Sequence, residues 1–361
     1  MNALMRPPVD PAVMRDCTRI SPWKSLALCM GVYAAAVAIA WACGGRSGWV
    51  LAPVGILLIA GLQMHLLILL HEGAHLLLHP NRKINDLIGD IFCAVPLLLL
   101  LKNYRVLHLT HHKYSGQPAR DPEARLYAGQ GYHYARRPGP AALRMLLADL
   151  SGLNAMKFVR DLNSWLAEQR AAGRVKDFEP RDYALIAGIW LPVAAAAWAF
   201  GFWPELLVFW VLPQPTVMFF FLKIHGYGEH TGASGPTEFE RTWIHETHPV
   251  EDYFIAPIYS GYHLEHHLFP RVPWYHMARF RRHLLSLPEF ADRANPVTVR
   301  SYLFGRRSIL RLMVWGAGEY RTNDLGAQTA ELATDDVVSA DCKAEVDEQL
   351  AALTPTAAHP L

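Results

Sequence analysis

Histidine spacing is the feature of this chain that points most directly to chemistry. The sequence has 361 residues and 18 histidines, and eight of the histidines fall into three tight groups. They are His71 and His75 in "HEGAH", His108, His111 and His112 in "HLTHH", and His263, His266 and His267 in "HLEHH". On a helix, spacings of three and four residues place side chains on the same face. Because neutral imidazole is a common ligand for iron, zinc and copper, the spacing predicts a metal centre.

The first group alone fits the H-E-x-x-H pattern of zinc peptidases, in which Glu72 would activate water. A zinc hydrolase needs only three protein ligands, so most of the histidines in the two repeats would have no role. Eight imidazoles suffice for two metal ions, and all-nitrogen ligation suits iron and dioxygen chemistry at least as well. A zinc peptidase remains one alternative. A non-catalytic metal carrier or transporter is another, and it would be expected to place ionisable residues within its membrane spans.

The elements that must position these histidines include long apolar runs. Hydrophobic residues make up 52% of the chain and charged residues 18%. Residues 25–45 and 49–70 carry no charged side chain, and residues 183–222 carry only Glu205. A membrane-spanning helix needs about 20 such residues. The sequence therefore predicts four transmembrane helices, near residues 25–45, 49–70, 183–201 and 205–222.

Basic residues predict the orientation of these spans. The segment 102–182 is rich in lysine and arginine, whereas the short turns between paired spans hold one basic residue or none. By the positive-inside rule, this segment, the region after residue 222 and both termini are cytoplasmic. Residues 84–101 are apolar enough for a fifth span. A single metal site needs all histidine groups on one side, so we expect this segment to dip into the membrane or lie along its surface.

The rest of the sequence predicts the domain organisation and limits the classes of partner. We expect a cytoplasmic segment at residues 1–24, one membrane domain at 25–317 and a disordered tail at 318–361, which is acidic and poor in aromatic residues. The five cysteines contain no C-x-x-C pair and fit a reducing compartment. No basic run interleaved with aromatic residues suggests nucleic-acid binding.

The order of the three groups resembles that of a known family. H-x-x-x-H, H-x-x-H-H and H-x-x-H-H among four spans resemble the membrane fatty-acid desaturase and hydroxylase superfamily. The stretches "HEGAHLLLHPNRKINDLIGD" and "YHLEHHLFPRVPWY" resemble its acyl-lipid desaturase branch, over residues 25–290 or so. The second stretch also resembles carotenoid ketolases and small-molecule desaturases related to rhizobitoxine synthesis. His263 stands where front-end desaturases often carry glutamine, and the haem motif H-P-G-G of their fused domain is absent. The three-residue spacing in the first group differs from the four of stearoyl-type enzymes.

The resemblance implies a fold, an activity and a set of partners. It implies an all-α integral membrane protein, with four transmembrane helices and a cytoplasmic histidine-rich helical cap that holds a di-iron site. The implied enzyme is an oxidoreductase that uses dioxygen as co-substrate to introduce a C=C bond into a lipid-linked fatty acyl chain. A hydroxylase, a ketolase or a desaturase of a non-acyl small molecule would use the same site. No flavin or nicotinamide fingerprint appears, so we expect a separate electron donor, a ferredoxin or a small haem protein with its reductase.

The resemblance also implies which side chains form the site. Besides the eight grouped histidines, His230 in "EHTG" matches a ligand of the family, and His225 is a candidate for a further ligand. Glu72, Asp90 and Asp121 are candidate carboxylates for orienting the ligating imidazoles. Simple turn capping is the alternative for Asp121. No catalytic residue beyond the metal centre is expected.

Overall fold

A computed structural model describes residues 6–45, 48–115, 117, 119–129, 139–230, 237–305 and 307–311. Nearly every regular element in these ranges is helical, as expected from the sequence. The exceptions are two strands of two residues each, β1 (Ile244–His245) and β2 (Thr298–Val299), which pair in parallel. The tail predicted at 318–361 lies outside the described residues.

Four helical segments are long and apolar enough to cross a membrane, which confirms the number predicted. They are α2 (Lys24–Gly44), the stretch Gly48–Ala74 that ends in α3 (Ala52–Ala74), α9 (Pro180–Phe200) and the stretch Trp203–His230. The last begins with α10 (Trp203–Glu205), continues through π-helical turns and ends in α11 (Phe219–His230). The second and fourth segments extend beyond the predicted ends at residues 70 and 222. Histidines of the site therefore lie on the same continuous helices as the apolar runs.

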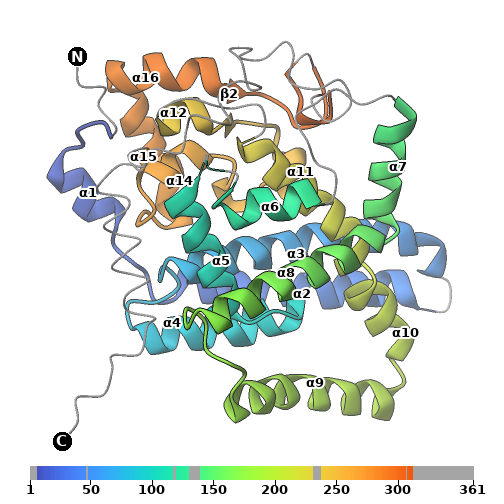
Figure 1. Cartoon of the computed structure of the whole chain (residues 1–361). Helices are drawn as coiled ribbons and strands as arrows, with labels where there is room; N and C mark the ends of the chain where they lie inside the picture. Colours follow the sequence, from blue (N-terminus) through green and yellow to red (C-terminus); the bar gives the residue numbers. More distant parts are fainter. Residues whose placement is uncertain are drawn as a thin grey trace, which may run out of the picture.

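Several of the shorter helices gather at one side of these long ones. In Figure 1 the helices α6, α12, α14, α15 and α16 lie above α2 and α3, whereas α9 lies at the lower edge. The bounds of further helices are α1 (Pro11–Cys17), α6 (Pro122–Gly129), α7 (Gly139–Leu150), α8 (Leu153–Ala171), α12 (Glu238–Arg241), α13 (Pro249–Phe254), α14 (His263–Leu268), α15 (Trp274–Leu285) and α16 (Pro288–Ala294).

The ambiguous apolar segment forms a bent pair of helices. The first arm is α4 (Arg82–Ile88), which continues as a π-helical turn, Gly89–Ala94, and a short 3-10 turn, Val95–Leu97. After Leu98, which adopts the left-handed conformation with φ of 60°, the chain continues as α5 (Leu101–Tyr114). The two arms meet at 93°. The bend brings the second histidine group back to the end of α3.

Side chains from two long helices satisfy the carbonyl groups at the tip of this bend. Trp190 of α9 donates its indole N–H to the carbonyl oxygen of Val95 at 3.1 Å. Trp210 and Gln214 both donate to the carbonyl oxygen of Pro96, each at 3.1 Å. Buried backbone carbonyl groups need hydrogen-bond donors, and these three side chains supply them at the tip of the bend.

A buried arginine joins the first two histidine groups. Arg105 of α5 donates from Nη2 to the carbonyl oxygen of Gly73 at 2.8 Å and from Nε to that of Ala74 at 3.1 Å. These carbonyls belong to the last turn of α3, and that of Gly73 also accepts from the amide of Leu76 at 3.2 Å and from Nδ2 of Asn85 at 3.0 Å. The arginine thus caps α3 and fixes α5 beside it, which places His75 against His108.

The third group depends on a close backbone approach. The amide of His245 in β1 donates to the carbonyl oxygen of Gly261 at 2.7 Å, just before α14 begins. A Cβ atom at position 261 would lie 2.5 Å from the carbonyl oxygen of His245, so only glycine fits here. Behind α14, Arg281 of α15 forms a buried ion pair with Glu265. Together these contacts hold the histidine-bearing face of α14 toward α3 and α5.

Candidate metal centre

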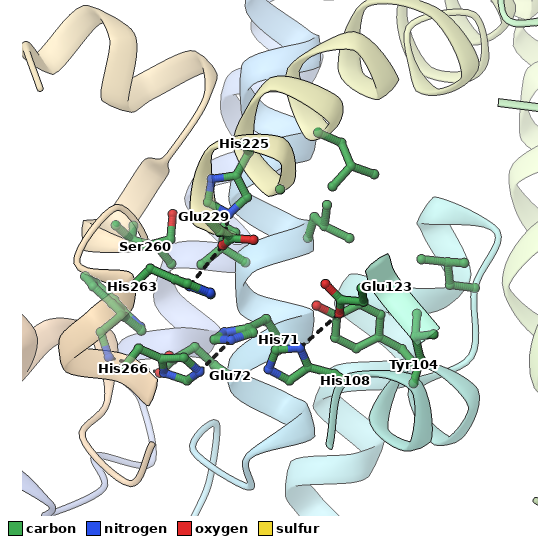
Figure 2. A pocket seen from close by; sticks show the side chains of 18 of the residues that line it. His71, Glu72, Tyr104, His108, Glu123, His225, Glu229, Ser260, His263 and His266 are labelled. Carbon is green, nitrogen blue, oxygen red and sulfur yellow. Dashed lines mark hydrogen bonds and ion pairs between the residues drawn. The ribbon is translucent and has the colours of Figure 1, made fainter. Parts of the chain in front are cut away.

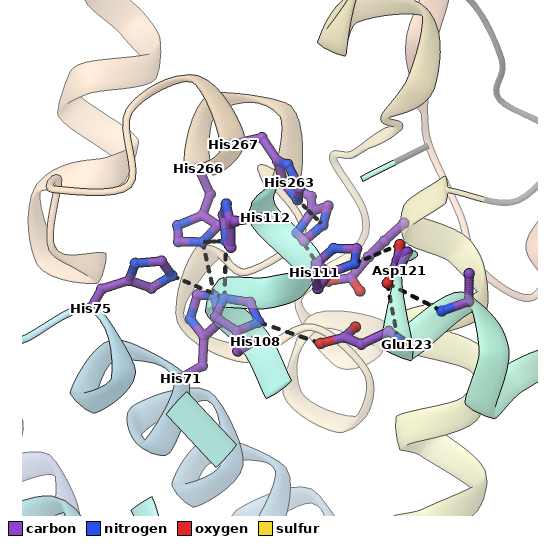
Figure 3. A network of polar contacts seen from close by, with 12 residues as sticks. His71, His75, His108, His111, His112, Asp121, Glu123, His263, His266 and His267 are labelled. Carbon is purple, nitrogen blue, oxygen red and sulfur yellow. Dashed lines mark hydrogen bonds and ion pairs between the residues drawn. The ribbon is translucent and has the colours of Figure 1, made fainter. Parts of the chain in front are cut away.

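The nine predicted ligands converge in one cluster, most of which Figure 3 shows, and seven of the nine residues are buried. The cluster divides into two groups, and in each group a single ligand atom from every residue lies within 4.8 Å of all the others. The five-histidine group consists of His71, His75, His108, His112 and His266. The four-histidine group consists of His111, His230, His263 and His267.

Helical geometry explains how each repeat serves both groups. In the second repeat, His108 and His112 are one turn apart and face the five-histidine group, while His111 points to the four-histidine group. The third repeat divides in the opposite sense, with its first and third histidines in the four-histidine group and its middle one in the other. The H-x-x-H-H pattern therefore bridges two sites from a single helix.

The ring nitrogens in the five-histidine group point at one another. Nε2 of His112 lies 3.0 Å from Nε2 of both His108 and His266, and the Nε2 atoms of His75 and His108 are 2.9 Å apart. His71 approaches His266 equally closely, at 2.9 Å. A neutral imidazole nitrogen carries either one proton or one lone pair. Hydrogen bonds alone therefore cannot satisfy this convergence, whereas a cation at its centre can.

The four-histidine group shows the same convergence and adds an oxygen behind every ring. Successive Nε2 atoms are 3.2 Å apart from His111 to His230, 3.1 Å from His230 to His263 and 3.0 Å from His263 to His267. The outward Nδ1 atoms pair as follows: His111 with Asp121 at 2.9 Å, His230 with the carbonyl of Arg241 at 2.9 Å, His263 with Glu229 at 3.0 Å, and His267 with Glu238 at 3.3 Å. An Nδ1–H donated to oxygen leaves the Nε2 lone pair free for a metal.

The rings of the five-histidine group have fewer oxygen partners for their Nδ1 atoms among the described residues. His108 has Glu123 at a longer distance of 3.4 Å from its Nδ1 atom. Among the residues that the structure describes, the buried Nδ1 atoms of His71, His75 and His112 have no hydrogen-bond partner. The two groups thus differ in the negative charge placed behind their rings.

Burial keeps the rings of His75 and His266 neutral, whereas at His111 the carboxylates of Asp121 and Glu123 outweigh burial and raise the pKa to about 10. Burial, reinforced by the charges of Arg105 and His263, lowers the pKa of His75 to about 3. Burial also lowers the pKa of His266 well below its usual value, and neighbouring imidazoles contribute. Neutral rings are the form that binds metal, so at neutral pH the lone pairs of these two side chains are available.

His225 belongs to neither group. Its Nε2 atom lies 3.0 Å from Oε1 of Glu229, and the same oxygen lies 3.0 Å from Nδ1 of His263. Glu229 thus connects His225 to a ring of the four-histidine group. Sequence reasoning did not select Glu229, although its position four residues after His225 and directly before His230 was a usable signal.

The three carboxylates selected from the sequence make different contacts. Asp121 lies against His111, as described above, and its other oxygen caps α6 by accepting from the amides of Glu123 and Ala124. Glu72 accepts a hydrogen bond from the amide of Trp274 at 3.0 Å, at the start of α15.

Asp90 occupies a similar capping position in the bent pair. It accepts from the amide of Leu101 at 2.8 Å, at the start of α5. The remaining acceptors behind the rings, Glu123, Glu238 and the carbonyl of Arg241, were not identified from the sequence. Glu238 and Arg241 lie on α12, and only the tertiary fold brings that helix to α14.

A cavity of about 130 Å³ adjoins the histidines (Figure 2). Rings from both groups line it, namely His71, His108, His263 and His266. Its apolar lining includes Leu67, Ile68, Leu99, Leu107, Leu126, Leu162, Leu222 and Met277, and its other polar side chains include Glu72, Tyr104, Glu123, Tyr127, His225, Glu229, Tyr259 and Ser260. A molecule in this cavity would lie directly against the rings of both groups.

Comparisons with known proteins agree with this arrangement. A family model described as fatty acid desaturase matches residues 47–298, which include all nine histidines. The dihydrorhizobitoxine desaturase of Bradyrhizobium elkanii is 26% identical over 254 residues, covering 67% of this chain and 70% of that protein. A probable fatty acid desaturase of Sorghum bicolor is 25% identical over 320 residues, covering 81% of this chain and 76% of that protein.

Proposed function

The chain belongs to the fatty acid desaturase family and is an oxidoreductase, and we propose that it is a membrane di-iron desaturase. In this proposal it uses dioxygen to introduce a C=C bond into a fatty acyl chain. The observation that carries the proposal is the convergence of nine imidazoles, seven of them from buried residues, in two groups beside one cavity. Each group would hold one iron ion.

The number of imidazoles supports this choice of metal over zinc. Five histidines form one group and four form the other, whereas three or four protein ligands suffice for a zinc site. All-nitrogen ligation of two ions suits iron and dioxygen chemistry.

The roles of the chain's own residues follow from their positions. When bound, two irons supply the activation of dioxygen, which with two electrons and two protons accepts two hydrogens from adjacent carbons and leaves as two water molecules. The carboxylates behind His108, His111, His263 and His267 hold these four imidazoles in the ligating tautomer. The apolar wall of the cavity excludes water and places the chain's methylene groups against His71 and His263.

A second candidate is a desaturase, hydroxylase or ketolase of a small polar molecule. The observation that favours it is the polar part of the cavity lining, where Tyr104, Glu123, Tyr127 and Ser260 could bind hydroxyl or amino groups. The name of the relative from Bradyrhizobium elkanii points in the same direction. A zinc peptidase is disfavoured, because a zinc hydrolase needs only three protein ligands, whereas nine imidazoles converge here.

The proposal also includes an orientation and a partner. The protein is an integral membrane protein whose histidine groups and both termini face the cytoplasm, with residues 25–317 as its membrane domain. Electrons come from a ferredoxin or a small haem protein with its reductase. The basic segment 102–182 is the docking surface that we propose for this donor.

Metal analysis combined with lipid profiling tests the proposal. Purified protein should contain about two irons per chain. Cells that express the chain should gain an unsaturated acyl lipid, and cells that express the His108→Ala variant should not. One zinc per chain without iron would overturn the di-iron assignment. A new unsaturated or hydroxylated small molecule with unchanged lipids would favour the second candidate.

A further inference from the structure

A second cavity, of about 260 Å³, adjoins the cavity beside the histidines. Four side chains line both cavities: Leu99, Tyr104, Leu107 and Leu162. The ring of Tyr104 stacks on that of His108, with centroids 5.7 Å apart and planes inclined by 6°. The boundary between the two cavities therefore lies one aromatic ring away from the five-histidine group.

The second cavity extends to the molecular surface. Its lining includes Leu98 after the tip of the bent pair and Val159 of α8, which are 66% and 54% exposed. Phe178, before α9, also lines the cavity and is 38% exposed. Because the same side chains face the cavity and the exterior, a chain-shaped ligand can enter here without unfolding the core.

The opening lies along a helix that can span a membrane. Ile186 and Trp190 of α9 line the second cavity. They lie six and ten residues after Pro180, where α9 begins, so they are about 9 Å and 15 Å along the helix axis. The hydrocarbon core of a bilayer is about 30 Å thick. With α9 across the membrane, this part of the opening faces hydrocarbon.

The lining of the second cavity matches a hydrocarbon chain. Its side chains are leucine, valine, isoleucine and aromatic residues, apart from Asn103 and Asn163. The indole N–H of Trp190 is already bonded to Val95. A charged molecule would have to cross the bilayer core to reach this opening, which is costly.

We propose that the second cavity is the entry route for an acyl chain of a lipid that resides in the bilayer. The chain enters between α8 and α9, passes Leu162 and Leu107, and reaches the histidines in the first cavity. This inference rests on the proposed function and names its substrate class. The substrate is a membrane lipid, and neither a water-soluble acyl thioester nor a small polar molecule.

Photolabelling of the full chain in liposomes tests this route. The probe is a phosphatidylcholine with a diazirine in the middle of one acyl chain, and no electron donor is added, so labelling needs no turnover. In the parent protein, adducts should map to residues of α5 and α8 that line the cavities.

Tryptophan substitutions test whether the label follows the route. Ile186→Trp fills the opening and Leu162→Trp fills the boundary between the cavities. Each should lower the yield of adducts on α5 by about tenfold, because an overfilled cavity excludes the chain. The matched control is Leu191→Trp, on the same helix, whose side chain is 67% exposed and is not among the residues that line either cavity. Its adduct yield should equal that of the parent. Iron content and elution volume verify that each variant is folded.

Two results would overturn the inference. One is an adduct yield that both tryptophan variants leave unchanged. The other is that an acyl thioester added from the aqueous phase labels the same residues and that Ile186→Trp does not reduce this labelling. Labelling is separate from catalysis, so the two proposals can fail independently. Labelling that both variants reduce, in a protein that forms no alkene, would leave the route standing and reject the desaturase function. Alkene formation in a protein whose labelling neither variant affects would leave the desaturase function standing and reject the route.

Discussion

At the scale of single residues, the two histidine groups differ in the charge behind their rings. Three carboxylates and one carbonyl oxygen accept from the Nδ1 atoms of the four-histidine group. In the five-histidine group, His108 has such a partner in Glu123, at the longer distance of 3.4 Å. A carboxylate that accepts an imidazole N–H raises the basicity of the ligand. We therefore expect the four-histidine group to hold its ion more tightly.

Asp121 and Asp90 provide a matched pair for testing this expectation. Both carboxylates cap a helix, but only Asp121 also contacts an imidazole, that of His111. Asparagine caps helices as well as aspartate does, so Asp121→Asn and Asp90→Asn should preserve the caps. Asp121→Asn should weaken metal binding at the four-histidine group by about 10–100-fold, and Asp90→Asn should not change it. Iron retained during dialysis against a graded series of chelator concentrations measures the difference. Equal iron retention in the two variants would show that the charge of Asp121 behind the ring of His111 does not strengthen metal binding.

Glu72 and His71 are neighbours in the sequence with different expected roles. Glu72→Gln should retain about two irons and measurable product, because the amide oxygen can still accept from the amide of Trp274. His71→Ala removes a ligand of the five-histidine group and should lose iron and product together. Iron content and product formation are measured side by side for both variants. A fully metallated Glu72→Gln protein without activity, together with proteolysis by the parent, would restore the peptidase interpretation.

The spacing of residues predicted which histidines gather, but not how they divide. Periodicity placed His108, His111 and His112 near one helix face. Which ring meets which neighbour depends on the angle at which α5 crosses α3 and α14, and no local pattern encodes that angle. The partner of His267 is equally remote, because Glu238 reaches it only through the packing of α12 against α14.

At the scale of elements, the bent pair α4–α5 is where hydropathy alone was ambiguous. Length and composition allowed residues 84–101 to cross the membrane, and the need for one metal site argued for a turn. The helical conformation ends at Leu98, two residues after Pro96, and the close approach of His75 and His108 shows that the chain returns to the end of α3. The donors that satisfy the tip come from helices more than 90 residues later in the chain. Sequence reasoning had no local signal for them.

Removing one of these donors should destabilise the fold. Gln214→Leu leaves the carbonyl oxygen of Pro96 with only Trp210 among its described donors. We expect the free energy of unfolding to fall by about 1–2 kcal/mol, since a buried acceptor loses a partner. Thr216→Val is the control, because the hydroxyl of Thr216 bonds to Leu212 within its own helix and the site is exposed. Unfolding in detergent, followed by tryptophan fluorescence, measures both. Equal stability of the two variants would contradict the role assigned to Gln214.

At the scale of the whole molecule, four apolar helices and a group of short helices build one site. Hydropathy predicted the number of apolar helices, and histidine spacing predicted that their ends meet. The two cavities were not predictable from the sequence, because α5, α8 and α9 contribute their walls from distant parts of the chain. Their shape depends on side-chain packing at the boundary formed by Leu107 and Leu162.

The path of the chain across the membrane provides the last prediction. The Nε2 atoms of His75 and His108 are 2.9 Å apart, so the segment between them must begin and end on the same side. Cysteines introduced at Asn81 and Arg160, which are both exposed, should react with an impermeant maleimide from that side. A cysteine at Gly45, between the first two spans, should react from the opposite side.

The native cysteines should not interfere with this labelling experiment. Cys17, Cys29, Cys43 and Cys93 are buried, and Cys342, outside the described residues, is replaced by serine in the background. Intact cells and inverted membrane vesicles give the two accessible faces. Labelling of Asn81→Cys and Arg160→Cys from opposite faces would mean a fifth crossing between them. The second histidine group would then be separated from the first, and neither metal group could form as described.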